Sequence, residues 1–154
     1  MTRYMLILLI LGVSGNSTAE IVSFSEISVD VASDWTYSIE QSRTLADAQG
    51  GLISISHPAG IGTLRMMTYV APDTVSRDRL RNLTNVQLST TLDWQEWGDF
   101  AGYDHSYVES GSFFKQWWLS NERTVLLIAY ESDAQESQLE IEVVETMIDS
   151  ISLL

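Results

Sequence analysis

Cysteine is absent from this chain of 154 residues, and proline and basic residues are scarce. Without cysteine the protein cannot build a disulfide scaffold, a cysteine-ligated zinc or iron–sulfur site, a thiol nucleophile or a lipid-modified N-terminal cysteine. The 8 Lys and Arg residues face 21 Asp and Glu residues, which gives a formal net charge of −13. Because binding to a phosphate backbone requires Lys and Arg, this balance argues against a nucleic-acid partner.

Hydrophobic residues, in contrast, make up 45% of the sequence. This fraction predicts a packed core and excludes a solvated acidic tail. The length fits one domain, or one domain preceded by a processing segment. Since the chain has no cysteine, we expect this core to provide the stability without disulfide bonds.

The N-terminus has the three-part pattern of a secretory signal peptide. Arg3 supplies a positive charge, Met5–Val13 is an uninterrupted apolar run, and small residues lead up to Ala19. The apolar run is shorter than the roughly 20 residues of a membrane span. We therefore expect residues 1–19 to be a cleaved signal peptide and residues 20–154 to form a single periplasmic or secreted domain that does not span a membrane. An uncleaved N-terminal anchor is the alternative.

The rest of the sequence indicates a mixture of strands and two helices. Apolar periodicity predicts helices over residues 75–90 and 134–151. Residues 92–100 are ambiguous, because they could end the first helix or begin an irregular strand. Alternation and turn residues indicate strands over residues 21–24, 27–31, 34–39, 52–56, 63–70, 102–109, 112–120 and 124–130.

Two of these strands predict how the layers stack. Phe113-Phe114 and Trp117-Trp118 place aromatic residues on both faces of one strand, since adjacent residues on a strand point to opposite faces. Residues 125–130 are apolar without alternation, as in strands that are covered on both sides. We therefore predict an α+β domain, in which helices pack on both faces of an antiparallel sheet of about six strands as an α/β/α sandwich.

The order of these elements resembles a known fold. A strand runs into Asp34-Trp35, an apolar strand ends in the acidic turn Glu131-Ser132-Asp133, and the last helix closes with Met147-Ile148-Asp149-Ser150-Ile151. From Ile21 to Leu154 the chain is similar to the Mog1/PsbP-like fold, which includes small DcrB-like proteins of the bacterial envelope. Members of that fold are mostly adaptors. The resemblance therefore implies a binding function rather than catalysis.

Catalytic and metal-binding patterns have little support in the sequence. The chain has no Gly-x-Ser-x-Gly motif, and its two histidines, His57 and His105, are read as a turn residue and a half-buried strand residue. Four carboxylates and His105 fall between Asp93 and His105, but the spacing of a calcium loop is missing, so we interpret the segment as a solvated acidic loop and leave cation binding open. We expect no cofactor.

A candidate partner surface follows from two clusters of residues. Trp94 and Trp97 lie among carboxylates, and Trp anchors many interfaces; the alternative is that both rings cap the core. Three arginines begin the first predicted helix, where the helix dipole favours acidic residues instead. The candidate surface comprises Trp94, Trp97, Asp99, Arg77, Arg79 and Arg81.

These observations lead to three functional hypotheses of different kinds. The first is an exported, non-enzymatic protein-binding or accessory domain of the bacterial envelope. The second is an immunity protein or inhibitor that neutralises a basic enzyme or toxin, because the acidity would steer a basic protein to it. The third is a hydrolase or metal-dependent enzyme that uses His57 or His105 with carboxylates.

Overall fold

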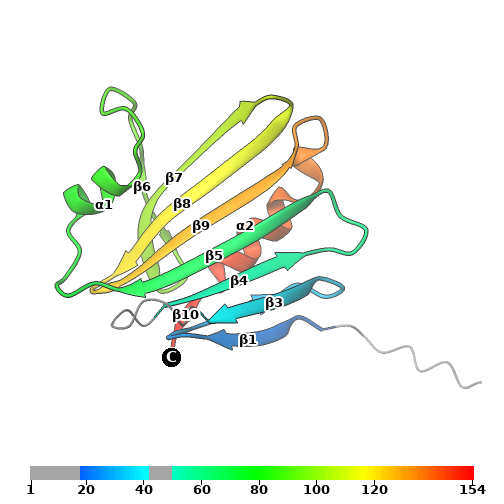
Figure 1. Ribbon diagram of the computed structural model, residues 1–154, viewed down its shortest axis with the longest axis horizontal. Helices are drawn as coiled ribbons and strands as arrows, with labels where there is room; N and C mark the ends of the chain where they lie inside the picture. The colour runs from blue at the N-terminus through cyan, green and yellow to red at the C-terminus, as the bar shows by residue number, and fades with distance from the viewer. Residues whose placement is uncertain (1–17, 42–49) are drawn as a thin grey trace, which may run out of the picture.

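The computed structural model describes residues 18–41 and 50–154 (Figure 1). Almost all of the predicted signal peptide, residues 1–19, lies outside the described residues and stays a prediction. The strands are β1 (Glu20–Phe24), β2 (Ile27–Val31), β3 (Thr36–Gln41), β4 (Gly50–Ser56), β5 (Gly62–Val70), β6 (Trp94–Trp97), β7 (Phe100–Glu109), β8 (Ser112–Asn121), β9 (Thr124–Asp133) and β10 (Ser152–Leu153). The helices are α1 (Arg77–Leu83), the 3-10 turn η1 (Ser137–Leu139) and α2 (Ile141–Asp149).

The predicted α+β class is confirmed, with most of the described chain in two antiparallel sheets. The main sheet has seven strands in the order β3-β4-β5-β9-β8-β7-β6. A small sheet, in the order β1-β2-β10, brings both ends of the domain together. Two-residue turns connect β6 to β7, β7 to β8 and β8 to β9 in the main sheet. In the turn between β7 and β8, Ser110 and Gly111 both have positive φ, 52° and 81°, as a two-residue hairpin turn favours.

One face of the main sheet carries the principal core, and we call it the covered face. Helix α2 lies behind β5 and β9 in Figure 1, and the small sheet packs on the same side. The side chains that meet there are almost all aliphatic or aromatic. They include Ile53, Ile55, Leu64, Met66, Trp117, Leu119, Leu126 and Ile128 from the main sheet, Val29 and Val31 from β2, and Val144, Met147 and Ile148 from α2.

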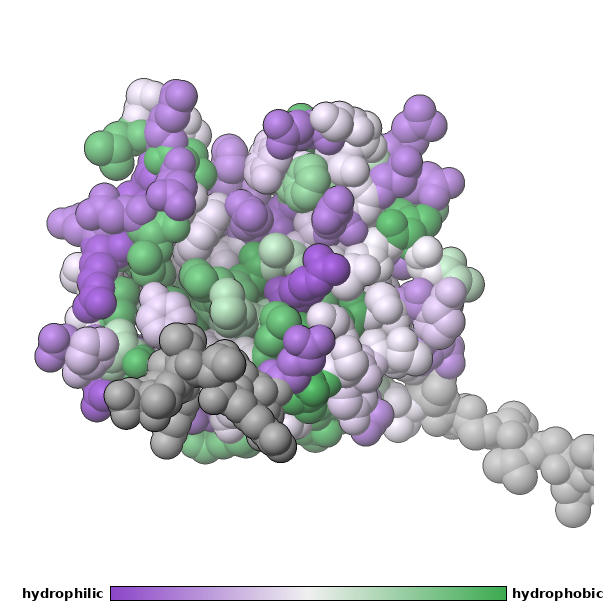
Figure 2. Space-filling view, in the orientation of Figure 1, coloured by the Kyte–Doolittle hydropathy of each residue, from purple (hydrophilic) through white to green (hydrophobic). Residues whose placement is uncertain are grey.

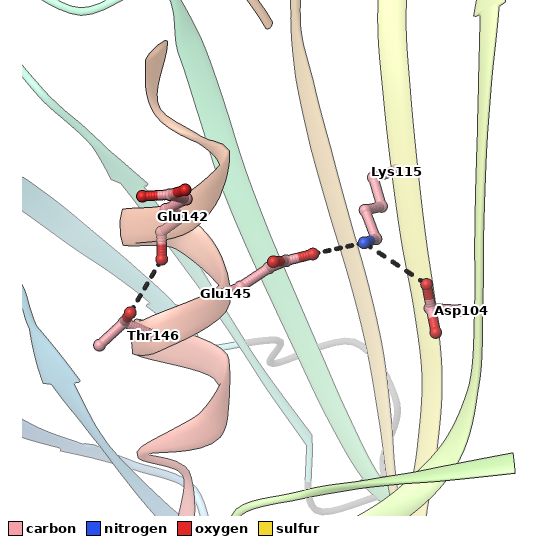
Figure 3. Close-up of polar contacts among 5 residues, drawn as sticks. All are labelled: Asp104, Lys115, Glu142, Glu145 and Thr146. Atoms are coloured by element: carbon pink, nitrogen blue, oxygen red, sulfur yellow. Dashed lines mark hydrogen bonds and ion pairs between the residues drawn. The ribbon is translucent and has the colours of Figure 1, made fainter. Parts of the chain in front are cut away.

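Two polar contacts fix α2 and the segment before it on the covered face. Lys115 on β8 lies between Glu145 of α2, which accepts its hydrogen bond, and Asp104 of β7, whose carboxylate is 3.5 Å from the ammonium nitrogen (Figure 3). Nearer the start of α2, the buried Glu140 accepts hydrogen bonds from the Tyr130 hydroxyl at 2.9 Å and from the Ile61 backbone N–H at 3.3 Å. These contacts explain why partly buried charges are tolerated there.

The predicted helix over residues 75–90 is wrong beyond Leu83. Ser76 caps the N-terminus by accepting a hydrogen bond from the Arg79 N–H, but Asn85 has a positive φ of 54° and the chain turns away. The Arg81 guanidinium holds this turn by donating to the carbonyls of Val86, Gln87 and Thr90, each at 2.9 Å. These local contacts outweigh the modest apolar periodicity of residues 84–90. The ambiguous residues 92–100 contain β6.

The predicted C-terminal helix is also too long at both ends. Residues 134–140 form turns and η1 rather than an α-helix, and Leu139, expected in the apolar stripe, is 73% exposed. The break lets the Glu140 side chain reach inward to Tyr130. After α2 the chain becomes extended and adds β10 to the small sheet. Of the apolar residues expected to pack, α2 buries Val144, Met147 and Ile148, whereas Val143 is 38% exposed.

Candidate functional site

The second face of the main sheet is covered at one end only, and we call it the open face. Helices lie on both faces of the sheet, as predicted, but α1 is one short helix at the edge near β6 and β7 (Figure 1). It buries Leu80 against a small second core with Val75, Ala71, Trp118 and Val125. Among the described residues, no helix lies over the middle of the open face.

A single row of apolar side chains crosses the open face at right angles to the strands. Register pairs connect each residue to the next, so the row lies across β4, β5, β9, β8, β7 and β6. We call it the apolar row, and its members are Leu52, Met67, Leu127, Trp118, Tyr103 and Trp94. Such directly opposed pairs have their Cβ atoms about 5 Å apart, so the side chains form one continuous strip.

The two ends of the apolar row differ in exposure. At the α1 end, Trp118 is 8% exposed and Trp94 packs edge-on against Tyr103 with ring centroids 5.2 Å apart. The Arg77 guanidinium lies 4.3 Å from the centre of the Trp94 ring and covers it by a cation–π contact. Towards the β4 end Met67 is 47% exposed, with the half-buried Leu52 and Leu127 on either side of it. The most exposed point of the row therefore lies on β5.

A polar row runs beside the apolar row, one side-chain pair further along the strands. It is formed by Ser38, Ser54, Arg65, Ala129, Gln116 and His105. Between the two rows lies a groove of about 330 Å³, lined mainly by members of the apolar row together with Arg65 and Gln116. Figure 2, drawn from this side, shows hydrophobic surface in the middle of the face with hydrophilic surface around it.

Aromatic rings continue along the β7 edge of the open face. His105 stacks near Tyr107, with centroids 6.1 Å apart, and Tyr107 stacks on Phe114 at 5.1 Å. Tyr107 is exposed, while His105 and Phe114 are half-buried. The open face thus combines aliphatic side chains with aromatic and arginine side chains, and Trp, Tyr and Arg are the residues enriched at binding hot spots.

The structure separates the two tryptophans that the sequence analysis grouped together. Because β6 is a strand, residues three apart point to opposite faces. Trp94 lies on the open face, whereas Trp97 packs on the covered face, edge-on to Trp117 at 6.1 Å. Asp99 holds the C-terminus in place: its carboxylate accepts a hydrogen bond from the Leu153 N–H at 3.0 Å, and its own N–H donates to the Ile151 carbonyl.

The three arginines of the predicted surface also have different surroundings. Arg81 is committed to the turn after α1, and Arg77 to the ring of Trp94. Arg79 is exposed. Of the six residues predicted as a partner surface, Trp94 and Arg77 lie together at the α1 end of the open face, and Trp97 and Asp99 lie elsewhere. Whether any of them contacts a partner stays a prediction.

The histidines and the acidic segment do not form one cluster. The Nδ1 atom of His57 accepts a hydrogen bond from the Ala59 N–H at 3.0 Å, as a turn residue would, and His105 is on the open face. Asp104 of the acidic segment pairs with Lys115. Within residues 18–41 and 50–154, no group of three His, Asp or Glu side chains is arranged to hold a metal ion.

The apolar row could not be found from the sequence, although all of its members except Trp94 lie in predicted strands. The residues belong to six strands, and only the register brings them into line. The weak signal was that Leu52, Met67 and Leu127 are each next to an apolar residue in the sequence. Adjacent residues on a strand point to opposite faces, so each of these strands has an apolar side chain on its second face. We attributed that second apolar face to helix packing.

Comparisons with known proteins support the fold. No family model and no curated protein matches the chain. Solved structures do: a protein from Bacteroides thetaiotaomicron has a TM-score of 0.60 at 14% identity, and LpqN of Mycobacterium tuberculosis, described as involved in cell envelope biogenesis, has 0.54 at 17% identity. Each match covers 90% of this chain, with 48% of the first protein and 87% of LpqN.

At these identities the similarity shows a shared fold, and one protein with that fold serves the cell envelope. The chain spans about half of the Bacteroides protein. Neither structure is described as Mog1/PsbP-like, so that resemblance stays a prediction. Among the described residues, no helix is both long and apolar enough to cross a membrane.

Proposed function

We propose that this protein is an exported accessory protein of the bacterial cell envelope, and that it acts by binding a partner through its open face rather than by catalysis. The observation that carries the proposal is the apolar row, in which Leu52 and Met67 belong to neither packed cluster of the described residues and Met67 is 47% exposed. Soluble domains rarely leave a contiguous apolar strip uncovered unless it binds something.

The envelope setting is supported by two independent features. The N-terminal sequence has the pattern of a signal peptide with a cut after Ala19. The fold is shared with LpqN, which is involved in envelope biogenesis. A protein with both features would work in the periplasm or outside the cell.

Another protein is the partner that the composition of the open face favours. Trp, Tyr and Arg side chains are enriched at the centres of protein interfaces, and Trp94, Tyr107 and Arg65 lie on this face. The net charge of −13 would speed the approach of a basic protein. The same electrostatic attraction supports the second candidate, an inhibitor or immunity protein that neutralises a basic enzyme.

Site-specific photocrosslinking in the native envelope tests the proposal. A photocrosslinking amino acid in place of Met67 reports on the open face, and the same group in place of Val143, exposed on α2, is the matched control. We expect a discrete adduct at position 67 that is absent at position 143 and is weakened by Leu52→Glu, which puts a charge on the apolar row. Equal adducts at both positions, or none above the control at position 67, would contradict the proposal.

A further inference from the structure

Arg65 is a cation beside an apolar groove, and this combination suits a ligand that has both an acidic group and an apolar chain. We propose that the groove binds a single-chain anionic amphiphile, whose acidic group pairs with the Arg65 guanidinium and whose apolar chain lies along Leu52, Met67 and Leu127. The inference rests on the proposed role of the open face as a binding face. It adds the chemical class of the ligand that binds at the centre of this face.

Most of the other bases of the described chain are committed to contacts within the protein. Four of the six have structural partners: Arg77 covers a ring, Arg81 holds a turn, Lys115 pairs with two carboxylates, and Arg123 donates to the Ala71 carbonyl at 2.8 Å. Arg79 is exposed on α1. Arg65 is exposed in the middle of the open face, and within the described residues no carboxylate lies within ion-pair distance of it.

Arg65 is also accessible to an acid. Its register partners are Ser54 on β4 and Ala129 on β9, both small, and the half-buried Gln116 follows on β8. Small neighbours leave the edge of the guanidinium open to a ligand. A carboxylate or phosphate can then accept two parallel hydrogen bonds from it, and Arg suits this pairing better than Lys because its donors form a fixed fork.

The shape of the apolar part of the groove favours an alkyl chain. Register steps from Leu52 through Met67 to Leu127 cross three strands, which at about 4.8 Å per strand gives roughly 10 Å of apolar strip. A strip of this form suits an extended alkyl chain. The groove volume of about 330 Å³ lies within the range of small-molecule sites.

An extended peptide fits the groove less well than an alkyl chain does. The strands under the groove, β5, β9 and β8, are each paired on both sides, so their backbone groups are already used in the sheet. A peptide backbone lying across them would lose water without gaining hydrogen bonds, which is costly. An alkyl chain has no polar backbone to satisfy.

Titration with dodecanoate below its micellar concentration tests the inference on the full chain. Methionine ε-methyl resonances locate the binding, because Met67 lies in the groove while Met66 and Met147 are buried on the covered face. We expect a saturable shift at Met67 alone. Arg65→Gln should weaken dodecanoate binding by about tenfold or more, because it removes the charge-assisted pair. Arg79→Gln, which removes an exposed arginine on α1, is the matched control and should leave the affinity unchanged.

Two further probes separate the acidic group from the chain. Dodecyltrimethylammonium has the same chain with the opposite charge and should not shift Met67 at dodecanoate concentrations that saturate it. Butanoate has the acid without a long chain and should fail as well. Urea unfolding midpoints of Arg65→Gln and Arg79→Gln should match that of the native protein, which shows that any loss of binding is local.

The inference is overturned if Arg65→Gln leaves the dodecanoate affinity unchanged, if Arg79→Gln lowers it equally, or if the cationic probe shifts Met67 as strongly. This failure is distinguishable from failure of the proposed function. Protein adducts at position 67 without dodecanoate binding would retain a protein-binding face and remove the amphiphile. Dodecanoate binding without protein adducts would retain the amphiphile and remove the protein partner.

Discussion

The two faces of the main sheet use the same strands for different purposes. On β5, Met66 is fully buried on the covered face while its neighbour Met67 is 47% exposed on the open face. The covered face packs against α2 and the small sheet, so its side chains stabilise the fold. The open face has a comparable apolar row with cover at one end only. An apolar side chain on a strand therefore indicates a position that favours burial. It does not indicate whether the group that covers it belongs to the same chain.

Charge follows the same division between the faces. Lys115 on the covered face lies between Asp104 and Glu145 and joins β8 to α2 (Figure 3). Arg65 on the open face has small or neutral register partners. A paired base fixes structure, whereas an exposed base beside an apolar groove can take part in binding. Matched substitutions of a buried or paired residue and an exposed one therefore test this distinction.

The largest expected effect comes from the two adjacent methionines. Met66→Ala should lower the free energy of unfolding by about 2–5 kcal/mol, because it leaves a cavity in the covered face. Met67→Ala should lower it by less than about 1 kcal/mol, because the side chain is half exposed. Urea unfolding followed by tryptophan fluorescence measures both. Equal losses would contradict the distinction between the faces.

The next effect concerns the buried carboxylate at the start of α2. Glu140→Ala should cost about 1–3 kcal/mol of unfolding free energy, because the Tyr130 hydroxyl and the Ile61 N–H would lose their buried acceptor. Glu142→Ala, two residues further along and exposed, should change it by about 0.5 kcal/mol or less. Similar values for the two variants would show that the Glu140 contact contributes little.

A smaller effect is expected at the arginines near the α1 end of the open face. Arg81→Gln should cost about 1–2 kcal/mol, because the half-buried guanidinium donates to several carbonyls of one turn. Arg79→Gln should fall within about 0.5 kcal/mol of the native protein. Thermal unfolding of the pair measures the difference, and the reverse ranking would contradict the assignment of Arg81 to the turn.

The smallest effect is confined to alkaline solution. Burial raises the pKa of Tyr130 above its ordinary value, and the hydrogen bond to Glu140 and its charge add to the rise. Since the folded protein keeps this phenol neutral after the unfolded chain would ionise it, its contribution to stability is complete below about pH 10 and decreases as the pH rises above that value. Tyr130→Phe should remove this part of the alkaline loss in unfolding experiments from pH 8 to 11. An unchanged pH profile in the variant would contradict the assignment.

Local patterns predicted much of the covered face. The strands and the buried stripe of α2, with Val144, Met147 and Ile148, follow from period-two and period-four spacing. The length of α1 could not be predicted, because its end depends on the Arg81 contacts with carbonyls up to nine residues away. The separation of Trp94 from Trp97 required knowing that this segment is a strand. The open face needed the register of six strands, which no single segment contains.

The central claim is that the open face is accessible in the folded protein and available to a ligand. A soluble paramagnetic agent added to the methyl-labelled chain tests it most directly, because it broadens only methyl groups that solvent reaches. We predict that the agent broadens the Met67 methyl resonance in the free protein and that dodecanoate reduces this broadening. The Met66 and Met147 resonances should be unaffected in both conditions. A Met67 resonance as protected as that of Met66 in the free protein would contradict the claim.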